Sequence, residues 1–115
     1  MVGLDLLDVG RLERALQRRP RLAERLFSQG ERDYAAGRAR PAEHLAARFC
    51  AKEAVAKALG MRGWSFGDVE VVATEAAPEL RLSGAVAKRA GELGARPYVS
   101  LTHTATTAGA IVVLK

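Results

Sequence analysis

Four charged side chains on one predicted helix could together bind a metal ion and phosphate. The helix-favouring run Leu45–Gly60 carries Glu53 with Arg48, Lys52 and Lys57, and we expect one face of this helix to present the carboxylate flanked by these cations. Hard cations take oxygen ligands, and Mg²⁺ usually takes one or two carboxylates plus substrate phosphates. Glu53 could therefore hold a divalent cation while Lys52 and Lys57 meet phosphate oxygens. A purely structural alternative stays open, because a Glu–Lys pair at i,i+4 stabilises a helix by about 0.2–0.5 kcal/mol.

A magnesium site at Glu53 requires a second carboxylate, and the start of the chain offers one. Apolar residues alternate there with Gly3 and Asp5, which is the pattern of a short strand with two different faces. Asp5 is therefore a carboxylate on the first predicted strand. The fold must bring this strand against the helix if the two acids are to act together.

The helix that positions Glu53 follows Pro41 and is closed by Gly60, as expected for a proline at a helix start and a glycine past its end. Small residues recur on it at spacings of four: Ala46, Cys50, Ala54 and Ala58. Residues at this spacing share one face of a helix. Such a row predicts that another element approaches the helix closely.

The remaining patterns predict an α+β fold with a mainly antiparallel sheet packed on the long helix, in a single domain spanning 1–115. We expect helices over 9–19, 21–27 and 85–93 and strands over 69–74, 80–83, 98–103 and 110–114. The segment 28–41 is expected to be a polar loop with at most one helical turn, around Glu31 to Tyr34. Asp8 is a good N-cap for the first helix. The last strand, AIVVL, is apolar throughout and is predicted to be buried on both faces.

Composition excludes several classes of protein. The chain has 115 residues and is 49% hydrophobic, as expected of one globular domain rather than a disordered segment. No run of 18 apolar residues and no signal-peptide pattern is present, so we expect a soluble, cytoplasmic protein without a membrane partner. Because Cys50 is the only cysteine, an internal disulfide is excluded, and we interpret it as a thiol of the core. One cysteine and two histidines are too few ligands for a usual zinc site.

Positive charge is concentrated near the start of the chain. The segment 11–40 holds nine arginines and four acidic residues. The difference of five positive charges equals the net charge of +5 for the whole chain. Such a surface predicts an acidic partner, either nucleic acid or an acidic protein, although a solvated basic face without a partner is an alternative. Aromatic residues make up only 5% of the chain, which disfavours a base-stacking RNA platform.

Three motifs follow one another along the chain: Gly3-Leu4-Asp5, the helix segment from Arg48 to Gly60 containing Phe49-Cys50-Ala51-Lys52-Glu53-Ala54, and Ser100-Leu101-Thr102-His103. Together they resemble the small holo-acyl-carrier-protein synthases of the 4′-phosphopantetheinyl transferase family. The helix motif is specific, whereas the first motif alone is weak. The resemblance spans nearly the whole chain in order and spacing.

The resemblance implies an enzyme that moves the phosphopantetheine arm of coenzyme A onto a serine of an apo acyl carrier protein from fatty-acid or polyketide synthesis, releasing adenosine 3′,5′-bisphosphate. It implies that Asp5 and Glu53 bind Mg²⁺ and that Lys57 acts with them. The proton acceptor is left open between Asp5, Glu53 and a metal-bound water. The family is trimeric, with active sites between subunits, so a monomer should be inactive.

Further contacts are implied by the same resemblance. Coenzyme A is expected to meet Arg48, Lys52, Lys57, Gly60, Pro78 and His103. An acidic carrier protein is expected to dock on Arg11, Arg18, Arg21, Leu22 and Arg25.

Some features depart from the family or favour other functions. The turn at Ala77-Pro78 lacks the family's usual glycine and basic residue, which puts the local coenzyme A contact in question. A small basic nucleic-acid-binding domain is the alternative function, and no nucleic acid is expected if the transferase reading holds. A non-catalytic relative that only binds carrier protein is disfavoured by the intact Asp5, Glu53 and Lys57.

Overall fold

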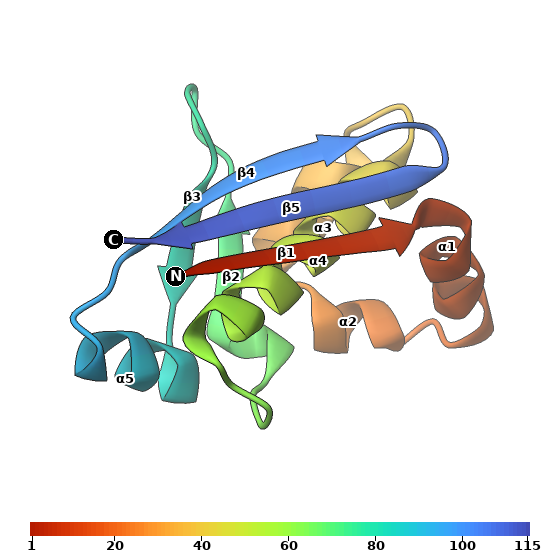
Figure 1. The fold of residues 1–115 in the computed structure, drawn as a ribbon. Coiled ribbons are helices and arrows are strands. Elements are labelled where there is room, and N and C mark those ends of the chain that lie inside the picture. The colour runs from red at the N-terminus through yellow and green to blue at the C-terminus, as the bar shows by residue number, and fades with distance from the viewer.

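The computed structural model describes residues 1–115 and has the predicted α+β architecture. Its elements are β1 (Val2–Asp8), α1 (Val9–Arg18), α2 (Leu22–Leu26), α3 (Gln29–Ala36), α4 (Pro41–Leu59), η1 (Phe66–Asp68), β2 (Val69–Val72), β3 (Glu79–Leu82), α5 (Gly84–Glu92), β4 (Pro97–His103) and β5 (Thr107–Leu114). The long helix α4 runs behind the main sheet (Figure 1). None of the helices combines the length and apolar character needed to cross a membrane.

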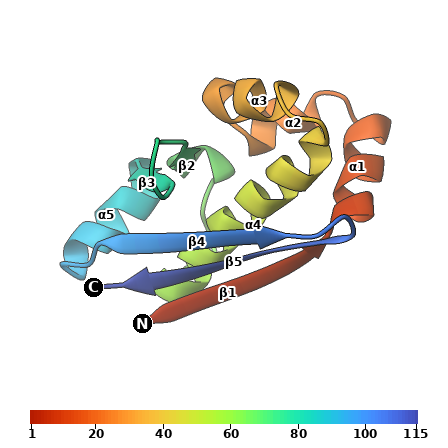
Figure 2. The same ribbon diagram turned by 90° about the horizontal axis from the view of Figure 1, so that it is seen from above.

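A three-stranded antiparallel sheet has the order β1–β5–β4, so the C-terminal strand lies at its centre. Strands β2 and β3 form a separate antiparallel hairpin. Helices α1 to α4 lie on one side of the three-stranded sheet, with α4 next to it and α2 and α3 beyond (Figure 2). The core forms where α4 packs against β1 and β5.

Strand β1 lies unusually close to α4, as the row of small residues predicted. A Cβ atom added at Gly3 would lie 1.9 Å from the carbonyl oxygen of Ala54 and 2.9 Å from the amide nitrogen of Ala58. Ala46, Cys50 and Ala54 are fully buried in this contact layer. The glycine and the small helix residues together let the two backbones meet.

Helix α4 begins one turn earlier than the run Leu45–Gly60 indicated. Pro41 occupies the first turn, where its missing N–H has no intrahelical acceptor to lose, and Gly60 ends the helix in the left-handed conformation at φ 67°. Twelve of the nineteen residues of α4 are buried. The helix is therefore the centre of the core rather than an amphipathic surface element.

Helix α3 was expected as a loop with at most one helical turn, and this was wrong. Ser28 and Glu31 form a capping box: the Glu31 backbone N–H donates to Ser28 Oγ, while the Ser28 N–H donates to Glu31 Oε1. The S-x-x-E signature of this cap is visible in the sequence. By contrast, the N-cap at Asp8 is confirmed, since its side chain accepts from the Arg11 N–H.

The expectation that β5 is buried on both faces was also wrong. Side chains alternate along the end of this strand: Ile111 and Val113 are exposed, whereas Val112 and Leu114 are buried. The exposed side chains lie opposite Leu4 and Val2 of β1, which are exposed as well. The sheet therefore presents an apolar outer face, on the side without helices (Figure 2).

Candidate active site

Asp5 faces helix α4 because side chains alternate along β1. Val2, Leu4 and Leu6 point to the outer face, so Gly3 and Asp5 point inward. The close approach of Gly3 to α4 then brings the Asp5 carboxylate, whose side chain is 17% exposed, to the last turns of that helix.

Lys57 joins the strand to the helix. Its Nζ donates to Asp5 Oδ1 at 2.9 Å and to the Leu4 carbonyl oxygen at 3.1 Å. The hydrogen bond to Asp5 raises the pKa of Lys57 above its usual value. The structural alternative, an ion pair between Glu53 and Lys57, does not form, because Lys57 pairs across to the strand instead.

Glu53 lies beside this pair and has no ion-pair partner of its own. Burial raises the pKa of the Glu53 carboxyl, and the neighbouring Asp5 carboxylate raises it further. Asp5, Glu53 and Lys57 line one cavity of about 540 Å³. The structure therefore brings together the two predicted carboxylates and the predicted catalytic lysine.

The donor set of this cavity fits a magnesium ion. It contains two carboxylates, and the chain has no group of three or more His, Cys, Asp or Glu side chains that could enclose a metal. Mg²⁺ is commonly bound by one or two carboxylates and completed by substrate phosphate and water, rather than by an all-protein cage.

Apolar side chains and one arginine complete the wall of the carboxylate cavity. Leu6, Leu7, Leu12, Ala15, Leu22, Leu26 and Phe49 line it together with Arg11. Of the predicted docking residues, Arg11 and Leu22 thus reach the cavity itself. Arg18, Arg21 and Arg25 are exposed on or beside α1 and α2, the helices that supply this wall.

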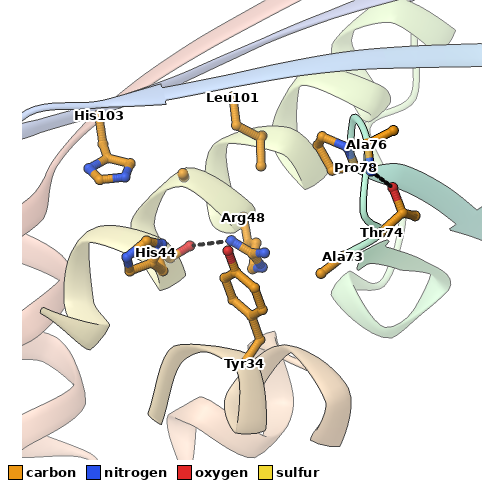
Figure 3. Close-up of a pocket in the computed structure, with 10 residues that line it drawn as sticks. Tyr34, His44, Arg48, Ala73, Thr74, Ala76, Pro78, Leu101 and His103 are labelled. Atoms are coloured by element: carbon orange, nitrogen blue, oxygen red, sulfur yellow. Dashed lines mark hydrogen bonds between the residues drawn. The ribbon is translucent and has the colours of Figure 1, made fainter. Parts of the chain in front are cut away.

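A second cavity of about 230 Å³ contains three of the predicted coenzyme A contacts, Arg48, Pro78 and His103 (Figure 3). Arg48 comes from α4, His103 from the end of β4 and Pro78 from the turn before β3. Tyr34 of α3 points into the same space, as the close-up shows. Thus four separate segments converge on a pocket in which every charged or titratable lining side chain is basic or phenolic.

Arg48 is the buried cation of this second cavity. Its guanidinium lies 4.1 Å from the centre of the Tyr34 ring, and its Nη1 donates to the His44 carbonyl oxygen at 3.3 Å. The Arg48 Nε is buried without a hydrogen-bond partner. A buried donor without a partner is costly, so this arginine is suited to receive an anionic ligand.

Two histidines line the second cavity beside Arg48. The His103 ring meets the His44 ring edge-on at 4.9 Å between centroids, and His103 Nδ1 lies 3.6 Å from Glu43 Oε2. Burial lowers the pKa of His44, and the charges of His103 and Arg48 lower it further. Three residues of this region, Tyr34, Glu43 and His44, were not among the predicted site residues. The available signal was the Ser28–Glu31 capping box, which predicts the helix that carries Tyr34.

The predicted site residues therefore divide between two cavities of one chain. Glu53 follows Arg48 by five residues, so the two side chains leave α4 about 140° apart. The expectation that Arg48 and Lys52 flank Glu53 on one face was wrong for this reason. No single cavity contains both the carboxylates and the Arg48–His103 group.

Lys52 is not available to a phosphate in this structure, which corrects its predicted role. Its Nζ pairs with Glu31 Oε1 at 2.8 Å, and the two side chains are 1% and 0% exposed. Burial lowers the pKa of Lys52, while Glu31 opposes that shift. Removing one partner of such a pair typically costs about 3–5 kcal/mol, because a charge is left buried and unpaired. Gly60 lines neither cavity, and its observed role is to end α4.

Comparison with known proteins shows the family of this chain. The family model for the 4′-phosphopantetheinyl transferase superfamily (ACPS) matches residues 1–104. The holo-[acyl-carrier-protein] synthase of Streptomyces griseus is 50% identical over 117 residues, covering 97% of this chain and 94% of that protein. The protein of the same name from Geobacter sulfurreducens is 44% identical over 119 residues, covering 98% and 94%.

Solved structures of similarly named proteins share the whole fold. The Helicobacter pylori holo-[acyl-carrier-protein] synthase in complex with coenzyme A superposes with a TM-score of 0.84 at 27% identity, covering 100% of both chains. The Bacillus anthracis holo-(acyl-carrier-protein) synthase in complex with CoA (3′,5′-ADP) gives a TM-score of 0.78 at 33% identity, covering 98% of this chain and 93% of that one.

Proposed function

This chain belongs to the 4′-phosphopantetheinyl transferase superfamily, and from that premise we propose that Asp5, Glu53 and Lys57 form its reaction centre. The protein transfers phosphopantetheine from coenzyme A to a serine of apo acyl carrier protein and releases adenosine 3′,5′-bisphosphate. The observation that carries the proposal is the meeting of the strand carboxylate, the helix carboxylate and the lysine in one cavity.

Asp5 and Glu53 are the residues that would hold Mg²⁺ beside the diphosphate of coenzyme A. The ion, when bound, would neutralise negative charge that grows on the leaving phosphate. Lys57 lies one turn after Glu53 and adds a cation on the same side. The ion pair with Asp5 holds the Lys57 ammonium group beside the carboxylates, where the phosphates of coenzyme A would bind.

The serine hydroxyl of the carrier protein must lose a proton during the transfer. Asp5 and Glu53 both line the cavity that this serine must enter, so either carboxylate is placed to accept the proton. Asp5 is ion-paired with Lys57, which leaves Glu53 as the carboxylate without a partner.

The second cavity would bind the adenosine bisphosphate end of coenzyme A. Arg48 and His103 provide cationic or donor groups, Tyr34 provides an aromatic surface, and Pro78 lies at the opposite wall. The unpartnered Arg48 Nε supports this assignment, since a phosphate oxygen would satisfy it.

Because one chain keeps these two halves apart, we place the complete site between copies of the chain in a homotrimer. The apolar outer face of the sheet supports such an assembly: Leu4 and Leu6 are 58% and 66% exposed, and Tyr98, Ile111 and Val113 accompany them. Contiguous apolar surfaces of this kind mark protein interfaces. A neighbouring copy would then present its Arg48 cavity to the carboxylate cavity of the first.

The arginines of α1 and α2 would dock the acidic carrier protein beside the carboxylate cavity. Arg11 lines that cavity, and Leu22 contributes an apolar contact next to it. Arg18, Arg21 and Arg25 extend the basic surface outward. This arrangement connects the basic segment to the reaction centre, which favours a carrier protein over nucleic acid as its partner. We place the reaction in the cytoplasm, consistent with an unpaired Cys50.

Mass spectrometry of an apo carrier protein mixed with this chain, coenzyme A and Mg²⁺ tests the proposal directly. We expect the mass of one phosphopantetheine group to be added to the carrier, and EDTA to prevent the addition. Carriers from fatty-acid and polyketide synthesis should both be supplied. Full transfer in EDTA, or by a protein carrying Asp5→Ala or Glu53→Ala, would rule out the proposed metal pair.

A further inference from the structure

A fully buried ion pair lies behind the second cavity without lining either cavity. Lys52 Nζ and Glu31 Oε1 are 2.8 Å apart, and neither side chain is more than 1% exposed. Neither residue touches the space where coenzyme A would bind. The transfer reaction, as described above, therefore does not explain why this pair is present.

The pair connects four separate elements through hydrogen bonds. Glu31 of α3 accepts from the Val71 N–H of β2 at 2.8 Å through Oε2, and from the Ser28 N–H at 2.8 Å through Oε1. Lys52 of α4 donates to the Phe66 carbonyl oxygen of η1 at 3.2 Å. Every oxygen of the carboxylate thus has a partner, and the bonds run in different directions.

Three of these elements form the walls of the second cavity. Tyr34 lies one turn after Glu31 on α3, and Arg48 lies one turn before Lys52 on α4. Thr74 lies three residues after Val71, in the turn that follows β2. Most side chains that surround the cavity therefore project from α3, from α4 or from the turn after β2, and only Leu101 and His103 come from β4 (Figure 3).

We propose that Lys52 and Glu31 are positioning residues that hold α3, α4 and the β2–β3 hairpin at the spacing required to bind the adenosine bisphosphate end of coenzyme A. The inference rests on the proposed function of the Arg48 cavity. Arg48 depends on this spacing directly, because its guanidinium packs on the Tyr34 ring of the neighbouring helix. The motif lysine thus acts through the wall of the pocket rather than by contact with phosphate.

Two variants test the pair, each with a different defect. Lys52→Met removes the ammonium group and its bond to η1. Glu31→Asp keeps the charge but shortens the side chain, so that it cannot reach both Lys52 and the Val71 N–H. Arg81→Met is the matched control, because it removes the exposed ion pair with Glu70 from the same hairpin. Each protein is checked by circular dichroism and size-exclusion chromatography before binding is measured.

The readouts are the affinity for adenosine 3′,5′-bisphosphate by calorimetry and the separate values of KM for coenzyme A and kcat. We expect both altered proteins to lose about tenfold or more in affinity and to show a matching rise in KM, as a displacement of pocket groups by a fraction of an ångström would produce. The kcat at saturating coenzyme A should change much less. The Arg81→Met protein should bind as the unaltered protein does.

Wild-type affinity in folded Lys52→Met or Glu31→Asp protein would overturn the inference. A loss of kcat with an unchanged KM would also overturn it, since the pair would then serve the carboxylate cavity. If Lys52→Met does not fold, Glu31→Asp together with Lys52→Arg decides the matter, and partial recovery of affinity in Lys52→Arg would support positioning by the buried charge. Failure of the unaltered protein to bind the bisphosphate would instead refute the proposed function, and the inference with it.

Discussion

Replacing Gly3 by alanine tests how the fold delivers Asp5 to the helix. The added Cβ would lie 1.9 Å from the Ala54 carbonyl oxygen, and 2.9 Å from both the Ala54 carbonyl carbon and the Ala58 nitrogen. All three atoms belong to the backbone of a buried helix, so no side chain can rotate away. Strand β1 must therefore retreat from α4, and Asp5, two residues along the strand, must retreat with it.

The magnitude follows from the size of the overlap. Ordinary contacts begin near 3.4 Å, so β1 has to move by roughly 1 Å or more to accept the methyl group. Overpacking of this kind costs about 1–3 kcal/mol of folding free energy, and backbone contacts place Gly3→Ala at the upper end. Displacement of a catalytic group by about 1 Å can reduce the rate about 10²-fold. We expect both effects in this variant.

Urea denaturation at fixed protein concentration and the rate of carrier modification measure these two effects. Gly91→Ala is the matched control, because nothing lies within 4 Å of its added Cβ and the residue is in helix α5. There the same substitution should stabilise the protein by about 0.5–1 kcal/mol without altering the rate. A Gly3→Ala protein with wild-type stability and wild-type rate would refute the close packing of β1 on α4.

Three other outcomes are expected. The substitutions Asp5→Asn and Glu53→Gln should each lower the transfer rate by a factor of about 10²–10³, with little change in the unfolding midpoint. If both altered proteins kept a rate near that of the unaltered protein, the two carboxylates would be excluded from the reaction centre. Leu4→Lys places a charge on the apolar outer face and should convert the assembly to folded, inactive monomers. Light scattering measures the oligomeric state and the transfer assay measures the activity, and an active monomer would contradict a site shared between subunits. Burial raises the pKa of Cys50 to about 12, so iodoacetamide at about pH 8 should label this thiol only after the protein is unfolded. Rapid labelling of the native protein would show instead that α4 opens locally.

Local patterns were sufficient to predict the elements that surround the carboxylates. The N-cap at Asp8, the alternation along β1 and the glycine after α4 each depend on neighbours in the sequence, and each is present in the structure. The small residues of α4 predicted the close strand because steric size alone decides how near two backbones can come. The pairing of Asp5 with Glu53, by contrast, was predicted from the family resemblance and not from these local patterns.

Other features depend on packing that no local pattern specifies. A helical wheel separates Lys52 from Glu53 by about 100°, but only the position of α3 decides that Lys52 is the one buried against Glu31. The position of Arg48 is different, because its separation of about 140° from Glu53 follows from their five-residue spacing and was predictable from helix geometry. Ile111 and Val113 resemble core residues in the sequence because they are apolar, yet one chain alone does not cover them.

The separation of the carboxylates from the Arg48 cavity has a genetic consequence under the proposed assembly. A chain defective only at Asp5 still carries an intact nucleotide pocket, and a chain defective only at Arg48 still carries intact carboxylates. When two such alleles are expressed in one cell, some mixed oligomers contain a junction formed by the two undamaged halves. Two null mutations could then complement each other, whereas two null mutations within the same half could not.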